Sequence, residues 1–173
     1  LRFHNIIKKI KEIINPKKVF SVYISCMSYL PKWRNNRNYK FSYSSSKKNG
    51  GGVALDLSHE IDYAQYLFGK ISKVNNSFSD KISNLDIDSD DVLFFSCKQK
   101  SINTFFYLDY FTKINKREII INEKNKTIVC DLINSKIVIK DKFRSKNKLI
   151  RLTSKKNHSL ENVHYNIKKG FFS

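Results

Sequence analysis

The sequence predicts an α+β domain in which helices pack on one face of an open, mostly antiparallel sheet of about six strands. Two observations support this prediction. Two segments before residue 70 repeat their apolar residues every three to four positions, which is the helical period. From residue 71 onward the apolar residues alternate with period two, and short polar turns separate the alternating segments, as is typical of antiparallel neighbours.

Taken in order, residues 3–14 form an amphipathic helix with lysines on its outer face, which Asn15-Pro16 ends. Residues 19–30 alternate as a strand. A long polar and aromatic loop follows at 31–48, and loops of this length in a compact domain are usually functional. The glycine run 50–52 then leads into one helix that ends at Gly69. The remaining predicted strands are residues 71–78, 92–98, 102–110, 118–122, 127–133 and 136–140.

The chain has 173 residues, a 40% hydrophobic fraction and a net charge of +18, so it can bury a core and is strongly basic. The lysines accompany many asparagines and isoleucines over the whole length, a bias that an AT-rich genome produces. Binding of a polyanion such as nucleic acid is the alternative explanation. Residues 1–141 form the predicted domain, and residues 142–173 are predicted to be a basic tail with little pattern.

The three cysteines indicate reduced thiols in a cytoplasmic protein, because Cys26, Cys97 and Cys130 lie far apart and show no metal-ligand spacing. We therefore expect no metal site. The sequence contains no signal peptide and no apolar run long enough to cross a membrane. It begins with Leu1 rather than Met, which suggests a fragment or a processed product.

The helix after the glycine run carries titratable residues on one side. Asp56 and His59 are three positions apart and Asp62 follows one turn later, so a single helix would present all three on the same face. A carboxylate and an imidazole on the inner side of an apolar helix suggest a functional site. The alternative is a buried structural histidine whose hydrogen bonds a neighbouring carboxylate satisfies.

The run from Gly50 to Tyr63 (GGGVALDLSHEIDY) resembles the signature of the glucose–fructose oxidoreductase/inositol dehydrogenase (Gfo/Idh/MocA) family. In this chain Asp and His are three residues apart, where many members have four. The resemblance continues over roughly residues 1–140 in the expected order. It is carried by Leu1–His4, Tyr29–Trp33, Tyr39–Ser44, Leu108–Phe111, Arg117–Ile119 and Thr127–Leu132.

The resemblance implies a two-domain enzyme of which this chain is one part. Family members bind NAD or NADP in an N-terminal Rossmann domain, which also supplies a catalytic lysine from a Glu-Lys-Pro motif. Their C-terminal domain contributes the substrate pocket and an open sheet used for homo-oligomerisation. This chain contains neither GxGxxG nor Glu-Lys-Pro. It therefore resembles the C-terminal domain alone, and we expect no catalysis without the Rossmann half.

The resemblance also implies roles for individual residues in oxidising a CH–OH group of a sugar, nucleotide sugar or cyclitol. His59 would take the hydroxyl proton, with Asp56 as its partner or as a hydroxyl ligand. The backbone of Gly50, Gly51 and Gly52 would pass close to the cofactor. The expected substrate contacts are Trp33, Arg34, Arg37, Tyr39, Tyr43 and Asp62. A nucleic-acid-binding domain and a purely structural oligomerisation domain remain the alternatives.

Overall fold

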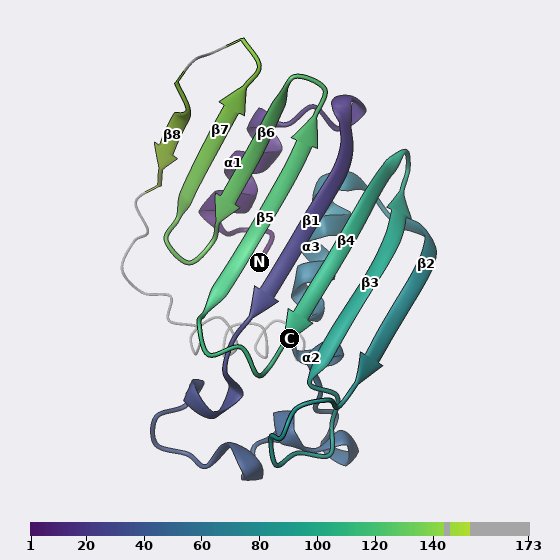
Figure 1. Cartoon of the computed structure of the whole chain (residues 1–173), viewed down its shortest axis with the longest axis vertical. Coiled ribbons are helices and arrows are strands. Elements are labelled where there is room, and N and C mark those ends of the chain that lie inside the picture. The colour runs from purple at the N-terminus through teal and green to yellow at the C-terminus, as the bar shows by residue number, and fades with distance from the viewer. Residues whose placement is uncertain (144–145, 153–173) are drawn as a thin grey trace.

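A computed structural model describes residues 1–143 and 146–152 (Figure 1). Its centre is one sheet with the strand order β2-β3-β4-β1-β5-β6-β7-β8. The strands are β1 Val19–Met27, β2 Ile71–Asp80, β3 Val92–Gln99, β4 Ile102–Asp109, β5 Lys116–Glu123, β6 Lys126–Asp131, β7 Lys136–Asp141 and β8 Lys148–Arg151. The α+β architecture is confirmed. The sheet, however, is mixed and has eight strands, not the predicted six.

Strand β1 makes the sheet mixed, because it lies in the middle between β4 and β5. It pairs in parallel with β4, from Ser21 opposite Asn103 to Met27 opposite Asp109, and antiparallel with β5. After β1 the chain leaves the sheet, returns at the far edge as β2, and reaches β4 through β3. Alternation in a sequence shows which face a side chain takes, but not which strand lies beside it.

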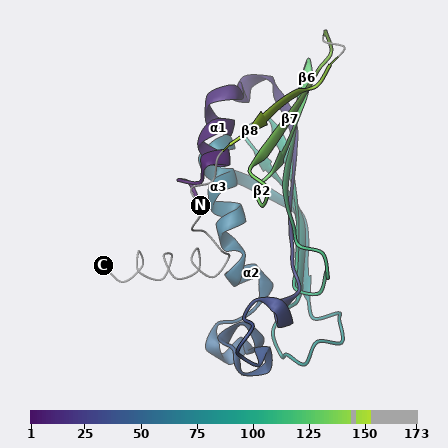
Figure 2. The same ribbon diagram turned by 90° about the vertical axis from the view of Figure 1, so that its left-hand side faces the viewer.

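The three α-helices found within residues 1–143 and 146–152 lie on one face of the sheet, as predicted and as the edge-on view in Figure 2 shows. They are α1 Asn5–Ile13, α2 Val53–Asp56 and α3 Ser58–Phe68. Helix α1 buries Ile6, Ile7 and Ile10 completely, and the buried side of α3 includes Tyr63 and Phe68. Within the described residues, no helix combines the length and the apolar character needed to cross a membrane.

The predicted single helix between the glycine run and Gly69 is interrupted at Leu57. The backbone angles of Leu57 (φ −99°, ψ 14°) end α2 and precede α3, and its side chain is 3% exposed in the core. The predicted end is confirmed, since Gly69 caps α3 with φ 103°. Because of the break, Asp56 and His59 belong to different helices, so their spacing does not define one continuous helical face.

The opposite side of the sheet, here called the open face, is covered by no helix from the described part of the chain (Figure 2). Large apolar side chains lie on it in neighbouring strands. Phe78 of β2 stacks on Phe94 of β3 with ring centroids 5.0 Å apart. Phe105 of β4 is paired in register with Tyr23 of β1, and the two are 46% and 37% exposed.

The sheet continues beyond residue 141, the predicted boundary of the domain, because β8 pairs with β7. The rest of the predicted basic tail, residues 153–173, lies outside the described residues. Cys26, Cys97 and Cys130 are buried free thiols.

Candidate active site

The glycine run packs tightly against the loop that precedes it. A Cβ on Gly51 would lie 2.1 Å from the carbonyl oxygen of Tyr43, and one on Gly52 would lie 2.1 Å from Asp90 Oδ1. Gly52 also has φ 123°, which side chains rarely adopt. Gly50, with φ 76°, has open space where its Cβ would be. Two of the three glycines are therefore explained by close packing within this chain.

The turn between β2 and β3 holds the start of α2 in place. The backbone carbonyl of Asp90 accepts from Val53 N at 3.0 Å, and its carboxylate accepts from Ala54 N at 3.0 Å. Two neighbours of Asp90 hold the preceding loop, because Asp88 accepts from Lys47 N and Ser89 donates to the carbonyl of Ser44. A carboxylate at the positive end of a helix satisfies backbone donors that have no partner within the helix.

Asp56, at the end of α2, binds tyrosines. The hydroxyl of Tyr110 donates to Asp56 Oδ2 at 2.6 Å, and Tyr43 is also hydrogen-bonded to this carboxylate. Burial, together with the charge of Asp56, raises the pKa of Tyr110 well above its usual range, so this hydroxyl keeps its proton and remains a donor. Asp56 thus joins α2 to the residue that follows β4.

His59, at the start of α3, contacts a different carboxylate, that of Glu60. His59 Nε2 lies 2.9 Å from Glu60 Oε1, and Arg117 of β5 binds the same oxygen. Tyr63 donates to Glu60 Oε2 at 2.6 Å. The Glu60 side chain is fully buried, and those of His59 and Arg117 are 11% and 8% exposed. An imidazole, a carboxylate, a guanidinium and a phenol therefore form one buried network.

The electrostatics of this network keep Glu60 ionised. Burial by itself would raise the pKa of Glu60, but the positive charge of Arg117 and the hydrogen bonds from His59 and Tyr63 outweigh it and lower the pKa to about 2. Burial tends to lower the pKa of Arg117, yet Glu60 raises it above its ordinary value. A buried ion pair of this kind persists only where further hydrogen bonds satisfy the remaining groups.

Next to this network is an open cavity of about 990 Å³. The loop after β1, the start of α3 and the start of β5 line it. The structure brings six of the predicted site residues together on its walls: Trp33, Arg34, Arg37, Tyr39, Tyr43 and His59. The guanidinium carbon of Arg34 lies 5.7 Å from the ring centroid of Tyr43. The predicted substrate-side loop and the predicted proton acceptor therefore face a common space.

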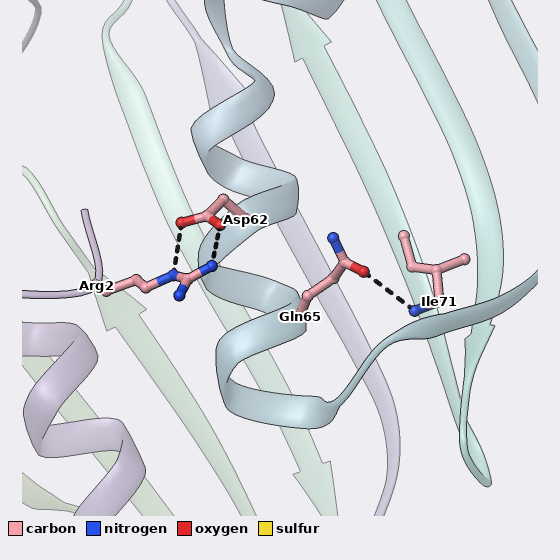
Figure 3. A network of polar contacts seen from close by, with 4 residues as sticks. All are labelled: Arg2, Asp62, Gln65 and Ile71. Atoms are coloured by element: carbon pink, nitrogen blue, oxygen red, sulfur yellow. Dashed lines mark hydrogen bonds and ion pairs between the residues drawn. The ribbon is translucent and has the colours of Figure 1, made fainter. Parts of the chain in front are cut away.

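Other predicted site residues are outside the cavity lining, namely Asp56, Asp62, Gly50, Gly51 and Gly52. The exposed carboxylate of Asp62 binds Arg2 through two hydrogen bonds, at 2.9 Å to Nε and 2.5 Å to one terminal nitrogen (Figure 3). In the same view Gln65, further along α3, accepts from the backbone N of Ile71 and so ties the helix to β2. Both contacts fasten α3 to neighbouring segments.

A profile of the oxidoreductase family's C-terminal alpha/beta domain, the Gfo/Idh/MocA type, matches residues 18–110, which is more than half of the chain. The chain belongs to this family. The matched segment runs from β1 to the residue after β4, so it includes His59, Glu60 and Tyr110. No curated protein matches the sequence.

Solved structures share the fold of this Gfo/Idh/MocA domain. An oxidoreductase from Agrobacterium radiobacter, in complex with NAD+, L-tartaric acid and magnesium, has a TM-score of 0.72 at 16% identity over 96% of this chain and 49% of its own. Levoglucosan dehydrogenase in complex with NADH has a TM-score of 0.70 at 16% identity, over 96% of this chain and 52% of its own. A super-repressor mutant of Gal80p from Saccharomyces cerevisiae has a TM-score of 0.72 at 16% identity, over 96% of this chain and 48% of its own. The chain spans about half the length of these proteins.

Sequence reasoning about the Gfo/Idh/MocA signature missed Glu60 and gave Arg117 no role. Glu60 directly follows His59, and adjacent residues on a helix do not normally face each other, so the spacing gave no signal. Arg117 is 57 residues away from Glu60. The predicted strand began at residue 118, whereas β5 begins at Lys116 and buries Arg117, so the need for a carboxylate partner became visible only in the structure.

Proposed function

We propose that the chain is the substrate-binding domain of an NAD(P)-dependent oxidoreductase that acts on a CH–OH group of a sugar, nucleotide sugar or cyclitol. The single observation that supports this most is His59, which lines the cavity while an ionised carboxylate contacts its Nε2. Family membership and the dehydrogenases among the structural neighbours support the same proposal. Catalysis requires a second, nucleotide-binding domain.

The role of His59 follows from its contact with Glu60. Because Glu60 is ionised, its oxygen accepts a hydrogen bond from Nε2–H, which makes Nδ1 the ring nitrogen that carries no proton. In the proposed reaction the substrate hydroxyl gives its proton to Nδ1 of His59, and the negative charge of Glu60 stabilises the imidazolium that forms. Arg117 and Tyr63 keep Glu60 ionised and oriented. Asp56 is a positioning residue in this scheme.

The nicotinamide cofactor, NAD or NADP, would accept the hydride from the substrate carbon. This chain offers few contact points for the cofactor. Gly51 and Gly52 pack against Tyr43 and Asp90, and only Gly50 has open space beside its Cα. The glycine run thus fits an edge contact with a cofactor that another domain holds. The proposed substrate contacts of this chain are Trp33, Arg37, Tyr39 and Tyr43, which line the cavity, whereas Asp62 lies outside the lining.

Two measurements test the proposal. First, the 173-residue chain is titrated with sugars, nucleotide sugars and cyclitols, and binding is followed by NMR. We expect at least one class to perturb the Trp33 indole signal, because this ring lines the cavity. Second, a Rossmann domain and NAD or NADP are added. We expect cofactor reduction that His59→Gln abolishes and the surface variant Lys140→Gln leaves unchanged. Binding by no class, or equal rates with and without His59, would overturn the proposal.

A second role, homo-oligomerisation through the sheet, is supported by the open face. Partly exposed aromatic residues lie on adjacent strands there, and contiguous apolar surface of this kind typically marks an interface. We propose that two copies pack their open faces against each other, as stacked sheets do.

A further inference from the structure

The walls of the cavity carry positive charge and no negative charge. None of the lining residues is an aspartate or glutamate. Four are cationic: Arg34, Arg37, Lys116 and Arg117. Two of the four already have carboxylate partners, because Lys116 lies 3.0 Å from Glu118 and Arg117 binds Glu60. Arg34 lies over the ring of Tyr43, and Arg37 is exposed in the loop. The charge available to a ligand therefore lies on the loop side.

Arg117 supplies a second observation, which concerns the opposite wall. One terminal nitrogen of its guanidinium binds Glu60, but its buried Nε has no hydrogen-bond partner among the residues that the structure describes. A buried N–H without an acceptor costs free energy, and the energy is recovered when an acceptor approaches it. Arg117 also lines the cavity. The Nε atom itself is closed to solvent, so the lining contribution of Arg117 comes from the rest of its side chain and this donor is not offered directly to the cavity.

The rest of the lining suits a polar ligand with an apolar side. Aromatic rings of Trp33 and Tyr39 provide flat surface, and asparagine side chains provide both donors and acceptors. The volume is about 990 Å³, at the upper end of the roughly 300–1,000 Å³ typical of small-molecule sites. There is room for a sugar and for a charged group attached to it.

We propose that the cavity binds an anionic substrate, a sugar or polyol whose carboxylate or phosphate group is held by the guanidinium groups of Arg34 and Arg37. Guanidinium groups match the geometry of both oxyanions. This inference rests on the proposed function, because it specifies which members of the proposed substrate class the domain takes. It also makes the loop after β1 the part of the domain that selects the substrate.

The test is direct binding to the 173-residue chain, measured by calorimetry with three probes that differ only near one carbon. Glucose is the neutral probe, glucuronate carries a carboxylate and glucose 6-phosphate carries a phosphate. We expect at least one charged probe to bind about tenfold or more tightly than glucose. The stronger of the two identifies the source of the oxyanion. Equal affinities for all three would overturn the inference.

Matched variants separate this site from the general basicity of a chain with net charge +18. Arg37→Gln and Arg34→Gln should each weaken the charged probe about tenfold while glucose affinity stays the same. Arg151→Gln removes the same charge from β8, outside the cavity lining, and should change nothing. If Arg151→Gln weakens binding as much as Arg37→Gln, or inorganic phosphate binds as tightly as glucose 6-phosphate, the charged probes bind by general attraction and the inference fails.

Failure of this inference can be told apart from failure of the proposed function. If neutral sugars bind at the cavity and charged ones gain nothing, the proposed oxidoreductase domain stands and only its substrate charge is wrong. If no sugar of any charge perturbs Trp33, the proposed function itself fails. Arg117 is left unchanged in these variants, because its loss would leave Glu60 buried without a counterion.

Discussion

Glu60 Oε1 lies 2.9 Å from Nε2 of the adjacent His59, and the same oxygen is bound by Arg117 of the central strand pair β1–β5. The ion pair between Glu60 and Arg117 joins the start of α3 to the sheet. It lies in the core between helix and sheet, where the other contacts are apolar. The imidazole at the edge of the cavity is thereby oriented by a partner that is itself fixed by β5. A site built on rigid elements in this way keeps its geometry without a ligand.

The Glu60 network makes the free energy of unfolding depend on pH in the acid range. The pKa of Glu60 is lowered from 4.5 to about 2 in the folded chain, so its contribution is complete above about pH 4.5 and is lost as the pH falls toward 2. We expect urea unfolding of the wild-type chain to shift to lower urea over that window. Glu60→Gln should lose roughly 3 kcal/mol at neutral pH and show a flatter acid dependence. Glu12→Gln, on the exposed side of α1, is the control; parallel curves for Glu60→Gln and wild type would contradict the prediction.

Gly51 is expected to tolerate a methyl group less well than Gly50. The added Cβ at Gly51 would lie 2.1 Å from the carbonyl oxygen of Tyr43, so backbone must move, and we expect a loss of about 3 kcal/mol. At Gly50 the space is open but φ is 76°, which costs about 1–2 kcal/mol for a residue with a side chain. Thermal unfolding of Gly51→Ala and Gly50→Ala checks the order. If Gly50→Ala is the more damaging, close packing is not what requires glycine here.

The hydrogen bond between Tyr110 and Asp56 is expected to be structural. Tyr110 is fully buried and its hydroxyl lies 2.6 Å from Asp56 Oδ2, so Tyr110→Phe should cost about 1–3 kcal/mol by leaving the carboxylate without this donor. Tyr23→Phe, on the open face, is the control. A double-mutant cycle with Asp56→Asn should give a coupling of about 1 kcal/mol or more. A coupling near zero would mean that the two side chains act independently.

Asp62 is expected to contribute little to either stability or ligand binding. Its bonds to Arg2 are exposed, with the two side chains 43% and 51% accessible, and pairs of this kind are worth about 1 kcal/mol or less. Asp62→Asn should therefore shift unfolding only slightly, and less at high salt. Sugar affinity should equal that of the wild type. A loss of affinity in Asp62→Asn, with stability unchanged, would instead support the predicted substrate contact.

We expect the chain to dimerise through its open face, and a charged residue placed on that face to prevent the dimer. Phe105 and Tyr23 are adjacent in register and partly exposed, so a glutamate at Phe105 would place an unpaired charge inside a sheet-on-sheet interface. We expect the wild-type chain to be a dimer by light scattering and Phe105→Glu to be a monomer with the same circular dichroism. Lys8→Glu on α1, on the other face of the sheet, carries a larger charge change and should remain dimeric. A monomeric wild type would contradict the proposed interface.

The sequence by itself determined the α+β class, the helices on one face, the end of α3 at Gly69 and the family. Each depends on local pattern: apolar period, glycine position and an ordered motif. It also indicated the loop residues that line the cavity, because a long polar loop beside a motif is a local signal.

Only the tertiary structure decided the parallel pairing of β1 with β4, the break at Leu57 and the partner of His59. These depend on which distant segments pack together. Glu60 meets Arg117 across 57 positions, and a buried carboxylate is stable only beside such a partner. The sequence indicated His59 and two candidate carboxylates, those of Asp56 and Asp62. The fold brought in a third, because packing of α3 on β5 turns Glu60 into the core and leaves Asp62 at the surface with Arg2.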